Sequence, residues 1–134
     1  MSRKVKAAAI QMRCSNNVGD NIKKADEMTR EAVKKGANII LLPELFERQY
    51  FCQERRYEYY AYAKSVQEND AVQHFTQTAK ELGVVIIVSF YEKNINVLYN
   101  TERHIFQMTI TIRRNSILRR VIQDLRCLIQ GLAI

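Results

Sequence analysis

The segment Gly36 to Glu44 constrains the fold more than any other part of the chain. It reads Gly-Ala-Asn-Ile-Ile-Leu-Leu-Pro-Glu, so a largely apolar stretch of strand length follows a glycine and stops at a proline. An apolar run without alternating polar residues is typical of a strand that is covered on both faces of its sheet. Because proline ends the strand, Glu44 is expected at the point where the chain leaves the sheet.

Helix and strand patterns alternate on both sides of this segment. Apolar residues recur at helical spacing over two ranges that each end at a glycine, 22–33 before Gly36 and 71–82 before Gly83. Apolar, β-compatible runs occupy 5–12, 37–42, 84–90 and, more briefly, 97–99. The order strand, helix, strand, helix, strand predicts an α/β fold in which helices cover a layered sheet.

Composition narrows the class of protein further. The chain has 134 residues, of which 47% are hydrophobic, and a single proline, which indicates one globular domain or part of one. We find no apolar run long enough for a membrane span and no signal peptide, so a cytoplasmic protein without a membrane partner is expected. The cysteines and histidines lack the spacing of a disulfide framework or a metal site; they are Cys14, Cys52, Cys127, His74 and His104.

The net charge of +7 suggests nucleic-acid binding, but its distribution argues against that function. Residues 1–101 carry 15 Lys and Arg against 12 Asp and Glu, whereas residues 102–134 carry 6 against 2. The first range therefore has no strongly basic face to hold a phosphate backbone. Composition changes after Thr101, where all basic residues are arginine and isoleucine becomes frequent, and this is the only boundary that the sequence suggests.

Glu44 is the first candidate for a functional residue. Catalytic groups collect at the carboxyl ends of strands in α/β sheets, although a carboxylate there can equally be an ordinary loop residue. Its neighbours Phe46, Tyr50 and Phe51 favour the functional interpretation. A carboxylate desolvated among aromatic rings would have a raised pKa, which suits a general base.

A set of motifs runs through roughly the first three quarters of the chain. They are Ala8-Ala9-Ile10-Gln11-Met12, Asn21 with Lys24-Ala25, the segment from Gly36 to Phe46, Tyr50-Phe51-Cys52-Gln53, the segment from Gly83 to Phe90 with Glu92, and Asn96 to Thr101. Together these motifs resemble the start of a carbon-nitrogen hydrolase of the nitrilase superfamily, with the N-carbamoylputrescine amidases as the nearest group.

This resemblance implies a fold and a reaction. The fold would be the N-terminal half of an α-β-β-α sandwich, which in this family usually forms dimers or larger oligomers. The family uses a Glu-Lys-Cys triad without a cofactor: the glutamate is the general base for a cysteine thiol, and the lysine stabilises the oxyanion. Glu44 lies at the position of the glutamate, and Tyr50 and Phe51 are expected to form walls of the pocket for a linear carbamoyl or amide substrate of polyamine or nitrogen metabolism.

The lysine and cysteine of the triad have no match in this chain. Lys93 lies too early, Cys127 lacks the strand and turn that the family places around its cysteine, and Cys14 and Cys52 belong to other segments. Codons permitted for residues 102–134 can be read in a shifted frame as Lys-Thr-His-Ile-Pro and further family-like text. The short segment that the family places between Thr101 and this lysine motif would then be lost. We therefore divide the chain into a truncated hydrolase domain, 1–101, and a frameshifted tail, 102–134, expected to be irregular or incidentally helical.

Truncation has two expected consequences. Without the lysine and the thiol, Glu44 has no group to deprotonate, so the chain alone is expected to be inactive. A sheet cut short is also expected to leave a strand edge and an apolar face uncovered. The alternative function is that of a non-catalytic fragment, which binds or regulates the full-length oligomeric enzyme.

Overall fold

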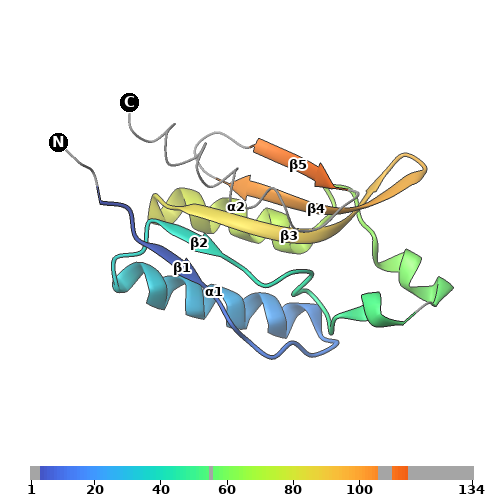
Figure 1. Cartoon of the computed structure of the whole chain (residues 1–134), viewed down its shortest axis with the longest axis horizontal. Coiled ribbons are helices and arrows are strands. Elements are labelled where there is room, and N and C mark those ends of the chain that lie inside the picture. The colour runs from blue at the N-terminus through green and yellow to red at the C-terminus, as the bar shows by residue number, and fades with distance from the viewer. Residues whose placement is uncertain (1–3, 55, 106–109, 115–134) are drawn as a thin grey trace.

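The computed structural model describes residues 4–54, 56–105 and 110–114, whose strands form one sheet (Figure 1). The strands are β1 (Ala7–Ala9), β2 (Ile39–Leu41), β3 (Val85–Asn94), β4 (Val97–Ile105) and β5 (Ile110–Arg114). They lie side by side in the order β1-β2-β3-β4-β5. The first three strands run parallel, whereas β4 and β5 are antiparallel to their neighbours. The predicted α/β sheet is confirmed.

Two capped helices connect the parallel strands. Helix α1 (Val18–Lys34) begins after Asn17, whose side chain accepts a hydrogen bond from the Asp20 backbone N at 3.1 Å. Helix α2 (Asp70–Leu82) begins after Asn69, which accepts from the Val72 backbone N at 2.9 Å. Both are N-caps of the preferred residue type. Gly83 ends α2 with a φ of 64°, which glycine adopts without strain. Neither helix is long and apolar enough to cross a membrane.

The main core lies between both helices and one face of the sheet. Ile22 and Ala25 of α1 and Phe75 of α2 belong to one buried cluster with Ile40 and other strand residues. Phe46, in the turn after β2, packs edge-on against Phe75 with ring centroids 5.8 Å apart. The strand residues that alternate with this set point away from the helices, as the pleat of a strand requires; they are Ile39, Val85 and Ile87.

The expected exposure of that second sheet face is wrong at these residues. Ile39 is 1% exposed, and Val85 and Ile87 are each 2% exposed. Each is therefore as well buried as the core beneath the helices. The apolar run of β2 is buried on both faces, which agrees with its lack of polar alternation. At the edge of the sheet, the side chains of Ala7 and Ala9 in β1 are exposed.

The tail expected to be irregular or helical is extended over the part that the structure describes. Strand β4 continues from Thr101 to Ile105 without interruption, and β5 pairs with it from Asn100↔Arg114 to His104↔Ile110. The physical reason is the length of β3: its partner registers run from Asn94↔Val97 to Ile86↔Ile105, so the hairpin holds β4 extended across residue 101. Residues 115–134, which contain most of the predicted tail, lie outside the described residues.

The aromatic segment between β2 and α2 contains two short 3₁₀ helices, η1 (Phe51–Gln53) and η2 (Tyr57–Tyr62). The sequence interpretation assigned no element to this segment. Its end is tied to the sheet because the Lys64 backbone N donates to the Tyr91 carbonyl at 3.1 Å and the Lys93 backbone N donates to the Lys64 carbonyl at 3.0 Å. The end of the segment is therefore held against the C-terminal half of β3.

Candidate functional site

The turn after β2 places Glu44 at the end of the sheet, as predicted. The backbone N of Leu42 still donates to the Ile87 carbonyl of β3 at 3.2 Å, and Pro43 then ends the pairing. Leu45 follows Glu44 with a φ of 50°, a left-handed conformation that is uncommon for a residue with a side chain. A reversal this tight turns the Glu44 side chain away from the buried Leu42 and Leu45.

A closed set of hydrogen bonds fixes the Glu44 carboxylate. Asn100 of β4 donates from Nδ2 to Glu44 Oε1 at 2.5 Å. Ser89 of β3 donates from Oγ to Asn100 Oδ1 at 3.4 Å, and its oxygen accepts from the Leu45 backbone N at 3.3 Å. Because Ser89 occupies the oxygen end of the Asn100 amide, the NH₂ end faces Glu44. We call Glu44, Leu45, Ser89 and Asn100 the carboxylate ring.

The carboxylate ring leaves Glu44 open to solvent. Glu44 is exposed, whereas Ser89 is only 4% exposed, so the expectation that Glu44 is desolvated is wrong. The reason is the reversal at Leu45, which sends the apolar side chains inward and the carboxylate outward. A carboxylate that is held through one oxygen on an exposed side chain is arranged to accept a proton from an incoming group.

Tyr50 and Phe51 lie near Glu44 but in different environments. Tyr50 is 44% exposed. Burial first, and then the charge of Glu44, raise the pKa of the Tyr50 phenol. Phe51 is half-buried, with its ring centroid 5.4 to 5.6 Å from those of Tyr59, Tyr62 and Tyr91. The structure therefore brings Tyr50 close to Glu44 and makes Phe51 the centre of an aromatic cluster.

Cys52 lacks the environment of an activated nucleophile. Burial raises the pKa of its thiol and the nearby charge of Glu44 raises it further, against a lowering by the hydrogen bond from Tyr50. A nucleophilic cysteine needs a lowered thiol pKa or an adjacent cation. Cys14 is half-buried, and burial also raises the pKa of its thiol. Neither cysteine of the described residues therefore replaces the thiol that the resemblance requires.

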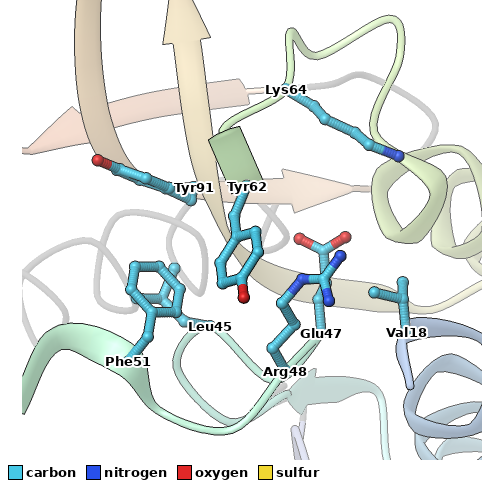
Figure 2. A pocket seen from close by; sticks show the side chains of 8 residues that line it. All are labelled: Val18, Leu45, Glu47, Arg48, Phe51, Tyr62, Lys64 and Tyr91. Carbon is cyan, nitrogen blue, oxygen red and sulfur yellow. The ribbon is translucent and has the colours of Figure 1, made fainter. Parts of the chain in front are cut away.

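A second carboxylate in the same turn, Glu47, was missed by the sequence interpretation. Glu47 lines a small cavity of about 30 Å³ between the turn, η2 and β3 (Figure 2). Both of its oxygens accept from Asn69 Nδ2, at 3.2 and 3.0 Å. Burial raises the pKa of the Glu47 carboxyl, against the lowering effect of the Asn69 hydrogen bond. Only its position three residues after Glu44 could have drawn attention to it.

The amide of Asn21 joins the same turn to the start of α1. Asn21 Nδ2 donates to the Glu47 carbonyl at 2.9 Å and to the Ser15 carbonyl at 2.7 Å. Asn21 is 2% exposed, so these are buried bonds that fix where the turn lies relative to the helix. Among the described residues, no group of three or more His, Cys, Asp or Glu is placed to hold a metal ion.

The sequence of the chain matches a known protein family. Residues 6–121 match the carbon-nitrogen hydrolase family. The chain is 47% identical over 98 residues to an N-carbamoylputrescine amidase of Oryza sativa subsp. japonica, covering 73% of this chain and 33% of that protein. It is 33% identical over 97 residues to a citrullinase of Francisella tularensis, covering 72% of this chain and 34% of the relative. The chain thus spans about a third of the length of these relatives.

Solved structures share the fold at lower sequence identity. A carbon-nitrogen hydrolase from Helicobacter pylori superposes with a TM-score of 0.75 at 21% identity, covering 90% of this chain and 42% of that one. Nit3 of Saccharomyces cerevisiae, a nitrilase-superfamily member, superposes with a TM-score of 0.67 at 18% identity, covering 82% of this chain and 44% of that one. The similarity extends over strands and helices on both sides of Glu44. By the extent of the family match and the identity to its relatives, the chain belongs to the carbon-nitrogen hydrolase family.

Proposed function

We propose that this chain carries the general-base part of an amidase that hydrolyses a linear carbamoyl or amide substrate. The observation that carries the proposal is the carboxylate ring, which holds the exposed Glu44 at the strand exit through one of its oxygens. The relatives named as N-carbamoylputrescine amidases support a substrate of that type. We place the reaction in the cytoplasm, in polyamine or nitrogen metabolism.

In this proposal, Glu44 removes the proton from a cysteine thiol supplied by the part of the fold that this chain does not match. The thiolate forms a bond to the carbonyl carbon, and a lysine stabilises the negative oxygen of the tetrahedral intermediate. The C–N bond then breaks as the leaving amine takes the proton from the Glu44 carboxyl. Water completes the reaction by releasing the acyl group from sulfur. Asn100 acts as a positioning residue, because its amide fixes the Glu44 carboxylate during both proton transfers.

Tyr50 and Phe51 form part of the substrate pocket in this proposal. Tyr50 is close enough to Glu44 for the carboxylate charge to raise the pKa of its phenol. Phe51 lies one residue further along the chain and contacts three other aromatic rings. Together they offer an apolar wall for the alkyl chain of a linear substrate, next to the base that starts the reaction.

We further propose that the 134-residue chain alone is inactive, because no segment of it matches the lysine or cysteine motif. The test is ammonia release from N-carbamoylputrescine by the purified chain beside its Glu44→Gln variant, with neither expected to exceed the blank. Turnover by the chain that disappears in Glu44→Gln would contradict inactivity while supporting the role of Glu44. Turnover that survives in Glu44→Gln would contradict the role of Glu44 itself.

The frameshifted tail has its own test in the coding nucleotide sequence. We expect the shifted frame after Thr101 to encode the lysine motif Lys-Thr-His-Ile-Pro. A protein with that frame and the lost segment before the motif restored should hydrolyse the substrate. Glu44→Gln should lower its kcat by roughly 10³-fold or more, since triad members act as a unit. Asn100→Leu should lower kcat less than Glu44→Gln does. A shifted frame without the lysine motif would disprove this origin of the tail.

The alternative function is a non-catalytic fragment that docks on the full-length enzyme. The exposed edge strand β1 favours it, since the side chains of Ala7 and Ala9 are small, uncharged and accessible. Co-purification of the chain with a full-length relative would support this function. Elution of the chain apart from that relative, under conditions where both are folded, would contradict it.

A further inference from the structure

A hollow lined by aromatic rings includes Phe51 of the proposed substrate pocket, but the tyrosines that open it to solvent have no role in the mechanism above. Its volume is about 490 Å³, within the usual range for small-molecule sites. Side chains of η1, η2, the link between them and β3 line it, among them Phe51, Cys52, Glu54, Tyr57, Tyr60 and Tyr91. We call it the tyrosine hollow. The hollow adjoins the carboxylate ring, because Tyr91 of the hollow is the strand partner of Asn100, which donates to Glu44.

The rings of the hollow meet at steep angles. Tyr57 and Tyr60 lie 5.9 Å apart between centroids at 73°, and Phe51 and Tyr91 lie 5.4 Å apart at 51°. Inclined rings present π-faces from more than one direction to a group placed between them. The negative face of an aromatic ring attracts a cation, and cages of aromatic rings bind quaternary and methylated ammonium groups in other proteins.

The charges around the hollow favour a cation over an anion. Arg56 is the one cationic side chain among its described lining residues, and its Nε is paired with Glu54 Oε2 at 2.9 Å. The same Glu54 oxygen accepts from the Tyr59 hydroxyl at 2.8 Å, and this hydrogen bond raises the pKa of the Tyr59 phenol. The pKa of Tyr91 is raised by burial. Both rings therefore stay neutral at physiological pH, while Glu44 adds a negative charge nearby.

Two of the rings are unusually open to solvent. Tyr57 is 85% exposed and Tyr60 is 55% exposed, although both belong to a structured 3₁₀ helix. Apolar side chains that are exposed next to one another often mark a binding surface, whereas single exposed ones are common on any protein. Their exposure also means that they contribute little to the folded core, so they can be replaced without unfolding the chain.

We propose that the tyrosine hollow binds the ammonium group of a short, unbranched alkylamine, which is the non-reacting end of the substrate. This inference rests on the proposed function for its orientation: with the ammonium group in the hollow, the carbamoyl or amide group at the other end of the alkyl chain reaches Glu44. The hollow then selects substrates by the charge of their far end. An alkyl chain that ends in a carboxylate is disfavoured by Glu44 and Glu54, and one that ends in a hydroxyl lacks the attraction of the rings.

The test is binding of n-butylammonium to the purified chain, followed by NMR of the tyrosine ring resonances, with 1-butanol and butyrate as neutral and anionic comparisons. We expect saturable shifts at Tyr57 and Tyr60 with n-butylammonium and much weaker ones with the other two. Tyr57→Leu and Tyr60→Leu should each raise the Kd about 2- to 5-fold, the effect of losing one exposed ring. Tyr57→Phe keeps the ring face and should keep the affinity. Tyr99→Leu, on β4 outside the hollow, is the matched control and should leave the Kd unchanged.

Three results would overturn the proposal. Equal binding of 1-butanol or butyrate would show that the hollow does not select ligands by charge. An unchanged Kd in both leucine variants would show that the rings do not hold the ammonium group. Shifts that follow protein concentration rather than ligand would identify a second copy of the chain as the occupant. Binding is measured without catalysis. A hollow that binds ammonium in the chain, together with a frame-restored protein that never hydrolyses amides, would disprove the proposed function and leave this site intact.

Discussion

The turn after β2 carries two carboxylates that meet opposite environments within one reversal of the chain. Glu44 is exposed and is held from the sheet side, by Asn100 of β4. Glu47 is half-buried and is held from the helix side, by Asn69 at the start of α2. The same residue type therefore serves two purposes, decided by which layer of the fold it faces. In the proposed function, exposure leaves Glu44 available for proton transfer, whereas the partly buried hydrogen bonds of Glu47 hold the turn against the start of α2.

The residues that hold the turn on its helix side and on its sheet side also differ in the other hydrogen bonds that they make. Asn69 caps a helix with one end of its amide and holds a carboxylate with the other, so two elements depend on it. On the sheet side, Ser89 joins Leu45 to Asn100 but caps nothing. Damage to the helix side should therefore cost more folding free energy than equal damage to the sheet side. The predictions below test that ranking.

The largest effect is expected from Asn69→Ala. The substitution removes the N-cap of α2, which costs about 1 kcal/mol, and leaves the half-buried Glu47 carboxylate without its amide partner, which costs roughly 1–3 kcal/mol more. Urea denaturation followed by circular dichroism would measure the change in the free energy of unfolding. The matched control is Asn17→Ala, which removes the N-cap of α1 alone. Equal losses in the two variants would show that the bond to Glu47 contributes nothing.

A smaller effect is expected from Ser89→Ala on the sheet side. Ser89 is 4% exposed, so its loss leaves the buried Leu45 N–H without an acceptor, at a cost of about 1–2 kcal/mol. The turn carrying Glu44 should also loosen, which would appear as faster amide hydrogen exchange at Leu45. Ser65→Ala is the control, because its hydroxyl bonds only the exposed Glu68, and we expect a loss below about 0.5 kcal/mol. An unchanged exchange rate at Leu45 would contradict the carboxylate ring.

The contrast also explains what the sequence could and could not predict. The apolar run before Pro43, the helix that ends at Gly83 and the position of Glu44 at a strand exit are local patterns, and all are found. Glu47 and Asn69 are 22 residues apart in sequence, so no local period joins them. The exposure of Glu44 depends on the positive φ of Leu45, which the sequence does not signal because leucine rarely adopts it.

The region after Thr101 is a different case. The change in composition is plain in the sequence, but the backbone of β4 crosses it inside a regular hairpin. Strand pairing is decided by the neighbouring strand as much as by the residues themselves, and β3 is long enough to pair with β4 as far as Ile105. A boundary in composition therefore need not be a boundary in structure. Whether residues 102–134 derive from a shifted frame stays a prediction for the coding sequence to decide.

The finest distinction between the two carboxylates lies in pH dependence. Burial raises the pKa of Glu47 in the folded chain above its ordinary value of 4.5, so the folded state holds this proton more tightly than the unfolded state. The contribution of Glu47 to stability is therefore greatest below the ordinary pKa and is lost as pH rises through the raised folded pKa. Glutamine does not titrate, so Glu47→Gln removes this pH dependence. The unfolding free energy of the native chain should therefore fall relative to that of the variant as pH rises from the ordinary pKa through the raised one.

The same substitution three residues earlier provides the control. Glu44→Gln replaces an exposed side chain, so at neutral pH it should change the free energy of unfolding by less than about 0.5 kcal/mol. Denaturation curves of both variants from pH 4 to 8, about the span in which carboxyl groups with ordinary or raised pKa titrate, would separate the two roles. If Glu44→Gln destabilised the chain as much as Asn69→Ala, Glu44 would be a residue that stabilises the fold. That result would contradict its proposed role as the general base.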